Sequence, residues 1–176
     1  RRELVEFRPH DAATRRMAGM LQRTFEVGDA PQYEPEMSSS IAARAAAAGV
    51  SPWALALELM MADGGRGLLL HPFENYTGGD LEVVRQMLQD DATVMGVGDG
   101  GAHVATICDA SSPTFLLMHW ARDRRRGPQL PIEFVVRKQT RDSALAYGLT
   151  DRGLIAPGMK ADINVIDFDA LSLLKP

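Results

Sequence analysis

Residues 93–103 read TVMGVGDGGAH, a short apolar run followed directly by a glycine-rich turn that carries one aspartate, Asp99. An apolar run of this length is typical of a strand buried on both faces. Because glycines leave space around a carboxylate, the turn favours a catalytic residue at the C-terminal end of a barrel strand. Two other interpretations fit: a purely structural turn, and a phosphate-binding G-x-G-x-x-G loop formed by Gly96, Gly98 and Gly101.

The phosphate-binding interpretation is the weaker one. No second strand with a terminal acidic residue follows at the distance that dinucleotide sites require. The polar residues CDASSP, 108–113, stand there instead. A structural turn, in which Asp99 only tightens the loop, stays an alternative on the local pattern alone.

Helical segments and apolar runs alternate along the rest of the chain. Capping residues, alanine-rich stretches and glycine stops predict helices over residues 11–22, 40–48, 51–61, 81–88, 113–121, 132–138 and 140–147. Buried strands are predicted over 67–73 and 93–97, an alternating strand over 161–168, and a loop over 25–37. Gly49 is expected to stop one helix and Pro52 to open the next. This order predicts parallel α/β units.

Composition and charge exclude several classes of protein. The 176 residues are 45% hydrophobic and 24% charged with a net charge of -4, which argues against a nucleic-acid partner. The apolar runs are too short to cross a bilayer. A single cysteine, Cys108, excludes an intrachain disulfide and favours a cytoplasmic protein. Because the chain opens with Arg1 rather than Met, we expect a fragment of a longer polypeptide.

The histidines and the basic cluster carry little signal by themselves. The four histidines are His10, His71, His103 and His119, and none forms an H-x-H or H-E-x-x-H pair. A lone histidine is usually structural, but His103 follows Asp99 by four residues and is expected to face the same cavity. Four arginines form the basic cluster, which predicts a solvated helix end: Arg122, Arg124, Arg125 and Arg126.

Two longer stretches together resemble the metal-dependent amidohydrolases, and within them the D-aminoacylase (N-acyl-D-amino-acid deacylase) family. VGDGGAHVATICDASSPTFLLMHWARDR, residues 97–124, is similar to the segment around barrel strand 8, where a turn carries the catalytic aspartate. TRDSALAYGLTDRGLIAPGMKADINVIDFD, residues 140–169, resembles the tail that leads from the barrel to a small β-sandwich. DAPQYEP and RGLLLHPFENY, residues 29–35 and 66–76, are similar too, so the resemblance covers nearly the whole chain.

The resemblance implies an α/β fold that is the C-terminal portion of a TIM-type (β/α)8 barrel plus the start of the closing β-sandwich. Residues 1–148 would supply strands 7 and 8 with their flanking helices, and residues 149–176 the incomplete return to the sandwich. The family's other metal ligands would lie upstream of Arg1. The fragment alone is therefore expected to be inactive, and to self-associate through exposed barrel edges.

The implied reaction is hydrolysis of a non-peptide C–N bond, with an N-acyl-D-amino acid as the small-molecule substrate and zinc as the cofactor. Asp99 is the implied catalytic residue, which moves a proton from water to the leaving amine, and it is also a candidate metal ligand. His103, Asn75 and Tyr76 are weaker candidates for substrate contacts, because each lies in or near a loop that follows a strand. Gly98 stands where relatives often carry serine.

Two alternative functions stay open at this point. One is another amidohydrolase of cyclic or linear amides, similar to dihydroorotase or hydantoinase. The other is a non-catalytic nucleotide-binding α/β module that uses Gly96–Gly101 as a phosphate loop.

Overall fold

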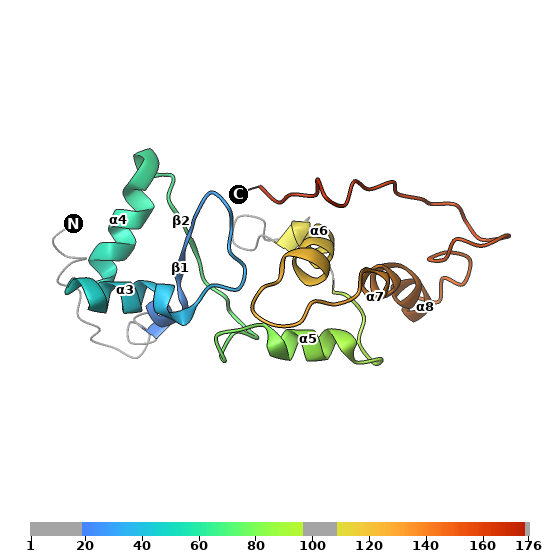
Figure 1. Cartoon of the computed structure of the whole chain (residues 1–176), viewed down its shortest axis with the longest axis horizontal. Coiled ribbons are helices and arrows are strands. Elements are labelled where there is room, and N and C mark those ends of the chain that lie inside the picture. Colours follow the sequence, from blue (N-terminus) through green and yellow to red (C-terminus); the bar gives the residue numbers. More distant parts are fainter. Residues whose placement is uncertain (1–18, 97–108, 175–176) are drawn as a thin grey trace. The chain divides into compact units, whose positions relative to one another are not determined.

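A computed structural model describes residues 19–96 and 109–174 of the chain (Figure 1). Its internal contacts divide the chain between Leu81 and Glu82 into two compact units. The predicted domain boundary at residue 148 falls inside the second unit and stays a prediction. Asp99, His103 and Cys108 lie outside the described residues.

The first unit is built from two short strands and two helices. Its elements are η1 (Leu21–Arg23), β1 (Phe25–Val27), η2 (Met37–Ser39), α3 (Ile41–Ala48), α4 (Pro52–Gly65) and β2 (Leu68–Leu70). β1 and β2 form a two-stranded antiparallel sheet in which Phe25 lies opposite Leu70 and Val27 opposite Leu68.

This sheet corrects two predictions. The strand expected over 67–73 is confirmed at its centre, but its partner runs antiparallel, not parallel. The partner, β1, begins the segment predicted to be a loop. That prediction depended on prolines and glycine further along, whereas the residues of β1 are Phe, Glu and Val, of which the aromatic and the β-branched residue favour strands.

Local signals decide where the two helices begin and end. Ser40 caps α3, since its Oγ accepts a hydrogen bond from the Ala43 amide at 3.2 Å. Gly49 ends α3 in the left-handed conformation, as predicted. Pro52 opens α4, and the backbone leaves helical geometry from Ala62 onward, which confirms the predicted end near residue 61.

The core of the first unit lies between these helices and the sheet. Leu21, Ile41 and Ala56 are buried together, and the partly buried side chains packed against them are Trp53, Leu55, Leu59 and Leu69. Burial of each large aliphatic side chain stabilises the unit by about 1.5–3 kcal/mol. Among the described residues, no single helix is long and apolar enough to span a membrane; the pair α3 and α4, bent by 111°, meets that test only jointly.

The described part of the second unit is helical and irregular. Its elements are α5 (Glu82–Gln89), η3 (Asp109–Ser111), α6 (Ser112–Phe115), the π-helix η4 (Leu116–Asp123), α7 (Ile132–Arg137), the π-helix η5 (Lys138–Asp142) and α8 (Ser143–Ala146). The predicted helices are confirmed in place, and the last two join into one continuous helical path from residue 132 to residue 146.

Two predicted strands are not found in the second unit. Residues 93–96 and 161–168 are irregular, and residue 97 lies outside the described part. A strand needs a neighbouring strand for its ladder of hydrogen bonds, which an alternating sequence cannot supply by itself. The described residues therefore show a mixed helix and strand structure, and the barrel itself stays a prediction.

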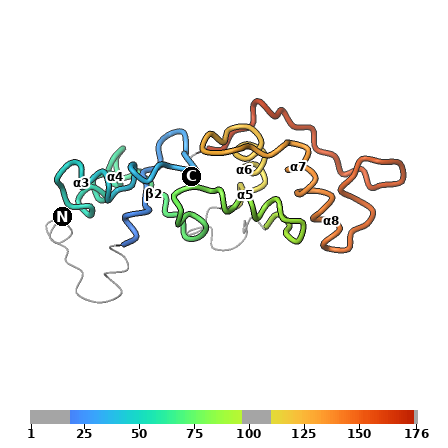
Figure 2. Tube along the Cα trace, turned by 60° about the horizontal axis from the view of Figure 1, so that its bottom comes forward, coloured from blue at the N-terminus to red at the C-terminus, as the bar shows by residue number. Residues whose placement is uncertain are grey.

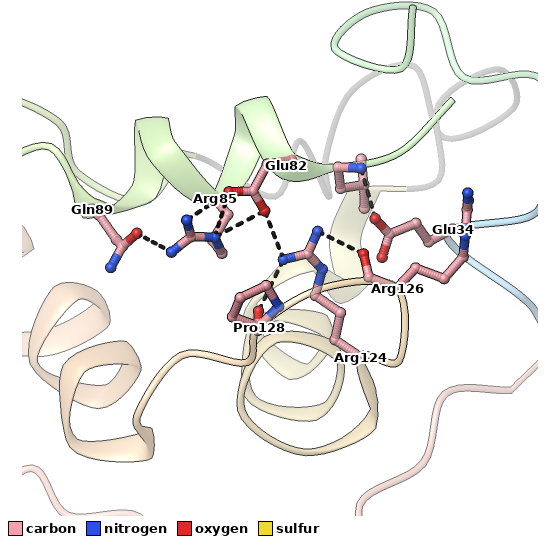
Figure 3. A network of polar contacts seen from close by, with 8 residues as sticks. Glu34, Glu82, Arg85, Gln89, Arg124, Arg126 and Pro128 are labelled. Carbon is pink, nitrogen blue, oxygen red and sulfur yellow. Dashed lines mark hydrogen bonds and ion pairs between the residues drawn. The ribbon is translucent and has the colours of Figure 1, made fainter. Parts of the chain in front are cut away.

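Arg124 corrects the prediction of a solvated basic helix end. Its side chain is 0% exposed, and its guanidinium carbon lies 4.9 Å from the centre of the Trp120 ring. Figure 3 shows it donating hydrogen bonds to Glu82 at 3.3 Å and to the carbonyl of Pro128 at 2.9 Å. Glu82 also pairs with Arg85 at 2.6 Å, so one carboxylate joins two guanidinium groups.

Arg122 donates hydrogen bonds to the backbone of the C-terminal tail. Residues 149–174 run as an irregular trace beyond α8 (Figure 2). The Arg122 guanidinium donates to the carbonyls of Phe168, Asp169 and Leu171, and it lies 5.6 Å from the centre of the Phe168 ring. These hydrogen bonds to residues 168–171 contact the described tail directly after the segment that was expected to be a strand.

The two glycines that flank the paired strands give a matched test of packing. A Cβ on Gly67 would lie 1.8 Å from the carbonyl oxygen of Leu59, whereas a Cβ on Gly28 would meet nothing within 4 Å. We expect Gly67→Ala to destabilise the chain by about 1–3 kcal/mol, the usual cost of overpacking. Gly28→Ala should leave stability almost unchanged, as measured by urea unfolding. Equal midpoints for the two variants would contradict the close approach of Gly67 to α4.

The ion pairs of Glu82 make the stability of the fold depend on pH. Hydrogen bonds from Arg85 and then from Arg124 lower the pKa of Glu82 from 4.5 to about 2. Because the folded state has the lower pKa, the carboxylate stabilises the fold fully above pH 4.5, and this contribution declines as the pH falls toward 2. The urea midpoint of Glu82→Gln should lie below that of the wild type at pH 7, and the two should converge in acid. A difference between the two urea midpoints that does not vary with pH would show that the charge of Glu82 contributes nothing to the stability of the fold.

Candidate functional site

The described residues that precede Asp99 are held by a buried lysine. Lys138, the first residue of η5, is 1% exposed, and its Nζ donates to the carbonyl of Asp90 at 2.7 Å and to that of Thr93 at 2.8 Å. The Thr93 hydroxyl donates to the carbonyl of Met87 at 2.6 Å. A buried ammonium must be hydrogen-bonded, and these contacts connect η5 to the turn after α5. Thr93 stands six residues before Asp99.

His119 occupies a packed position after the segment that contains Asp99. Its ring is buried, stacks on Phe115 with the ring centres 4.8 Å apart, and meets the edge of Trp120 at 5.2 Å. This placement is typical of a core histidine, and agrees with the structural role expected for a lone histidine.

Tyr76 and Asn75, two of the predicted substrate contacts, lie in the loop that follows β2. Tyr76 is 1% exposed, its hydroxyl donates to the carbonyl of Pro35 at 2.6 Å, and its ring meets Phe25 edge-on. Asn75 is exposed and has a left-handed backbone with a φ of 60°. The hydroxyl of Tyr76 thus serves the packing of the first unit, while the substrate contacts of both residues stay predictions.

The same loop holds a histidine that the sequence did not single out. His71 directly follows β2, is half-buried, and places its Nδ1 3.0 Å from the hydroxyl of Thr24. Burial, followed by the charge of Arg23, lowers the pKa of His71 below its ordinary value of 6.5. Hydrogen bonds to the backbone of Arg23 and of Met20 act in the opposite direction, but the net effect favours the neutral ring.

Glu34 is a second residue that sequence analysis missed. It is buried, and its Oε1 accepts a hydrogen bond from the backbone amide of Leu81 at 2.7 Å (Figure 3). Its partner lies 47 positions away in the sequence, so no local pattern could indicate this bond.

The residues that the structure describes do not form a metal centre. Within them, no group of three or more His, Cys, Asp or Glu side chains is placed to hold a metal ion. This donor set therefore does not fit a zinc site. Asp99 and His103 lie outside the described residues, so the metal contact of Asp99 stays a prediction.

Comparison with known proteins identifies the family. The family model described as "Amidohydrolase family" matches residues 10–176, a range that contains Asp99 and both of the stretches quoted above. Searches of curated proteins and of solved structures gave no match. Because the family match spans nearly the whole sequence, this chain belongs to the amidohydrolase family, whose members are hydrolases of amide and related bonds.

Proposed function

We propose that this chain belongs to a zinc-dependent hydrolase of N-acyl-D-amino acids, and that Asp99 is its catalytic residue. The observation that carries the proposal is the family match over residues 10–176. This range contains the only G-D-G-G motif of the sequence, at residues 98–101. The narrower D-aminoacylase assignment depends on the resemblance of residues 97–124 and 140–169.

In the proposed reaction, the oxygen of a water molecule bonds to the acyl carbon, and the bond between that carbon and the amide nitrogen breaks. The products are a carboxylate and the free D-amino acid. Asp99 takes a proton from the attacking water and delivers it to the departing nitrogen, which would otherwise leave as an unstable anion. The pKa of the departing amine is far above that of a carboxyl group, so this transfer runs downhill once the bond has broken.

The contacts around Lys138 support this role for Asp99. General acid–base catalysis needs its carboxylate held within hydrogen-bond distance of the reacting atoms. Lys138 holds the chain at Asp90 and Thr93, shortly before the turn.

The cofactor proposed for the complete protein is zinc, in keeping with the metal dependence that is general in this superfamily. Its ligands are proposed to lie outside the described residues. We further propose a cytoplasmic protein with a small-molecule substrate and without a nucleic-acid partner, supported by the single cysteine and the net charge of -4. Exposed apolar side chains in the tail, such as Val165 at 98%, support self-association.

Substitution of Asp99 tests the catalytic role. In the intact enzyme, Asp99→Asn should reduce kcat by roughly a hundredfold or more, because the amide cannot accept or deliver the proton. Asp91→Asn is the matched control, since Asp91 is an exposed aspartate two residues beyond the end of α5. Turnover of N-acetyl-D-amino acids measures both variants, and near-normal turnover by Asp99→Asn would refute the role.

Removal of metal tests the cofactor and the substrate class together. Dialysis of the intact enzyme against a chelator should abolish hydrolysis of N-acetyl-D-amino acids, and added zinc should restore it. The L-enantiomers and the cyclic amides dihydroorotate and hydantoin serve as comparison substrates. Full activity after chelation would exclude zinc, and faster turnover of a cyclic amide would favour the dihydroorotase-like alternative.

A further inference from the structure

Residues 62–66, at the end of α4 and before β2, hold an aspartate in a backbone conformation that glycine usually occupies. The φ angle of Asp63 is 52°, and the next two residues, Gly64 and Gly65, have φ angles of 69° and 89°. Among the described residues other than glycine, only Asp63 and Asn75 have a positive φ. Residues 61–66 are all exposed. This connection is therefore an open turn that water reaches, and it is not part of the core of the first unit.

Asp63 is followed by a glycine whose surroundings are empty. A Cβ placed on Gly64 would meet nothing within 4 Å. Because glycine has no side chain and adopts many backbone conformations, its amide nitrogen can approach the carboxyl carbon of a preceding aspartate with little obstruction. The sequence contains one other Asp-Gly pair, Asp99–Gly100, which lies outside the described residues. Asp63–Gly64 is thus the described pair in which the backbone is most open to attack on the aspartate side chain.

Arg66, three residues further along, binds the carboxylate of Asp63. Its Nη2 donates to Oδ1 at 2.9 Å, and its Nε donates to Oδ2 at 3.2 Å and to the backbone carbonyl of Asp63 at 3.1 Å. The guanidinium is always charged, so it stabilises the ionised carboxylate, whose oxygens are poor leaving groups. Both side chains are exposed, 77% for Arg66 and 70% for Asp63, so solvent weakens this pair. Arg66 therefore opposes a reaction at the carboxyl group without preventing it.

We propose that Asp63–Gly64 is a site of spontaneous isomerisation to isoaspartate, and that Arg66 slows this modification. The backbone nitrogen of Gly64 bonds to Cγ of the protonated Asp63 carboxyl group. The carboxyl hydroxyl and the amide proton leave as water, which closes a succinimide ring. A second water molecule then opens the ring: cleavage between the nitrogen and Cγ restores aspartate, whereas cleavage between the nitrogen and the backbone carbonyl carbon gives isoaspartate. One water leaves and one enters, so the reaction needs no oxidant or reductant.

Isoaspartate lengthens the backbone beside a closely packed position. The chain then runs through Cβ and Cγ of residue 63, which adds one carbon atom between α4 and β2. A Cβ on Gly67 would already lie 1.8 Å from the carbonyl oxygen of Leu59, and the following residue, Leu68, pairs with Val27. Because protein interiors are close-packed, an extra backbone atom here loosens the packing of β2 against α4. We expect the modified form to unfold at a lower urea concentration than the unmodified form.

Peptide mapping of the intact protein tests the proposal. Wild type and Arg66→Gln are incubated at pH 7 and digested, and isoaspartate at residue 63 is identified by mass spectrometry with electron-transfer fragmentation. We expect isoaspartate to accumulate at residue 63 in the wild type, and roughly two- to fivefold faster in Arg66→Gln, the effect of losing one exposed ion pair. The absence of isoaspartate at residue 63 from both proteins would overturn the site, and equal rates would overturn the role of Arg66.

Controls separate this chemistry from general unfolding. Asp63→Glu keeps a carboxylate beside Arg66, but its cyclisation would need a larger ring, so modification of residue 63 should fall to background. Asp91, an exposed aspartate followed by alanine, should stay unmodified throughout. If Arg66→Gln accelerated isomerisation of Asp99–Gly100 equally, the substitution would be loosening the whole chain, and the restraint by Arg66 would be overturned. The two forms of the wild type, separated by chromatography, should differ in urea midpoint, and equal midpoints would overturn the predicted loosening.

Discussion

The buried ammonium of Lys138 is the constraint on which much of the second unit depends. A cation that is removed from water needs hydrogen-bond acceptors, since its burial without them costs on the order of several kcal/mol. The Nζ of Lys138 donates hydrogen bonds to the backbone carbonyls of Asp90 and Thr93, which follow the end of α5. One side chain thus determines the path of a segment that belongs to no helix or strand.

The same arrangement recurs in the second unit. Arg122 donates to carbonyls of the tail, and Arg124 donates to those of Arg126 and Pro128. In the described residues of this unit, where strands are absent, long cationic side chains satisfy backbone carbonyls that a ladder would otherwise occupy. Charge-assisted bonds of this kind are stronger than neutral ones, so a few of them can hold extended segments.

The helices could be predicted from the sequence because their signals are local. Gly49 and Pro52 lie at the ends of the helices that they delimit, and each acts within one helical turn. Strands depend instead on a partner elsewhere in the chain. The alternating pattern at 161–168 is typical of a strand, yet the structure has no paired neighbour for it among the described residues. By contrast, β1 pairs with β2, whose residues lie at least 41 positions further along the sequence.

The site shows the same division between local and distant signals. Asp99 could be predicted as a site residue because glycines surround it in the sequence, and this stays a prediction. The environment of His71 could not, because Thr24, whose hydroxyl lies 3.0 Å from its Nδ1, is 47 positions away in the sequence. Arg124 was misjudged for the same reason: its neighbours in the sequence are charged, but Glu82, 42 positions away, and Trp120 make a buried position favourable.

Family membership indicates the class of bond that is broken, but it leaves the choice of substrate to other residues. A catalytic carboxylate, the role proposed for Asp99, would move a proton in the same way for any amide, so it would not by itself distinguish one acyl amino acid from another. Discrimination comes from polar groups that a wrong ligand would leave unpaired in a poorly solvated place.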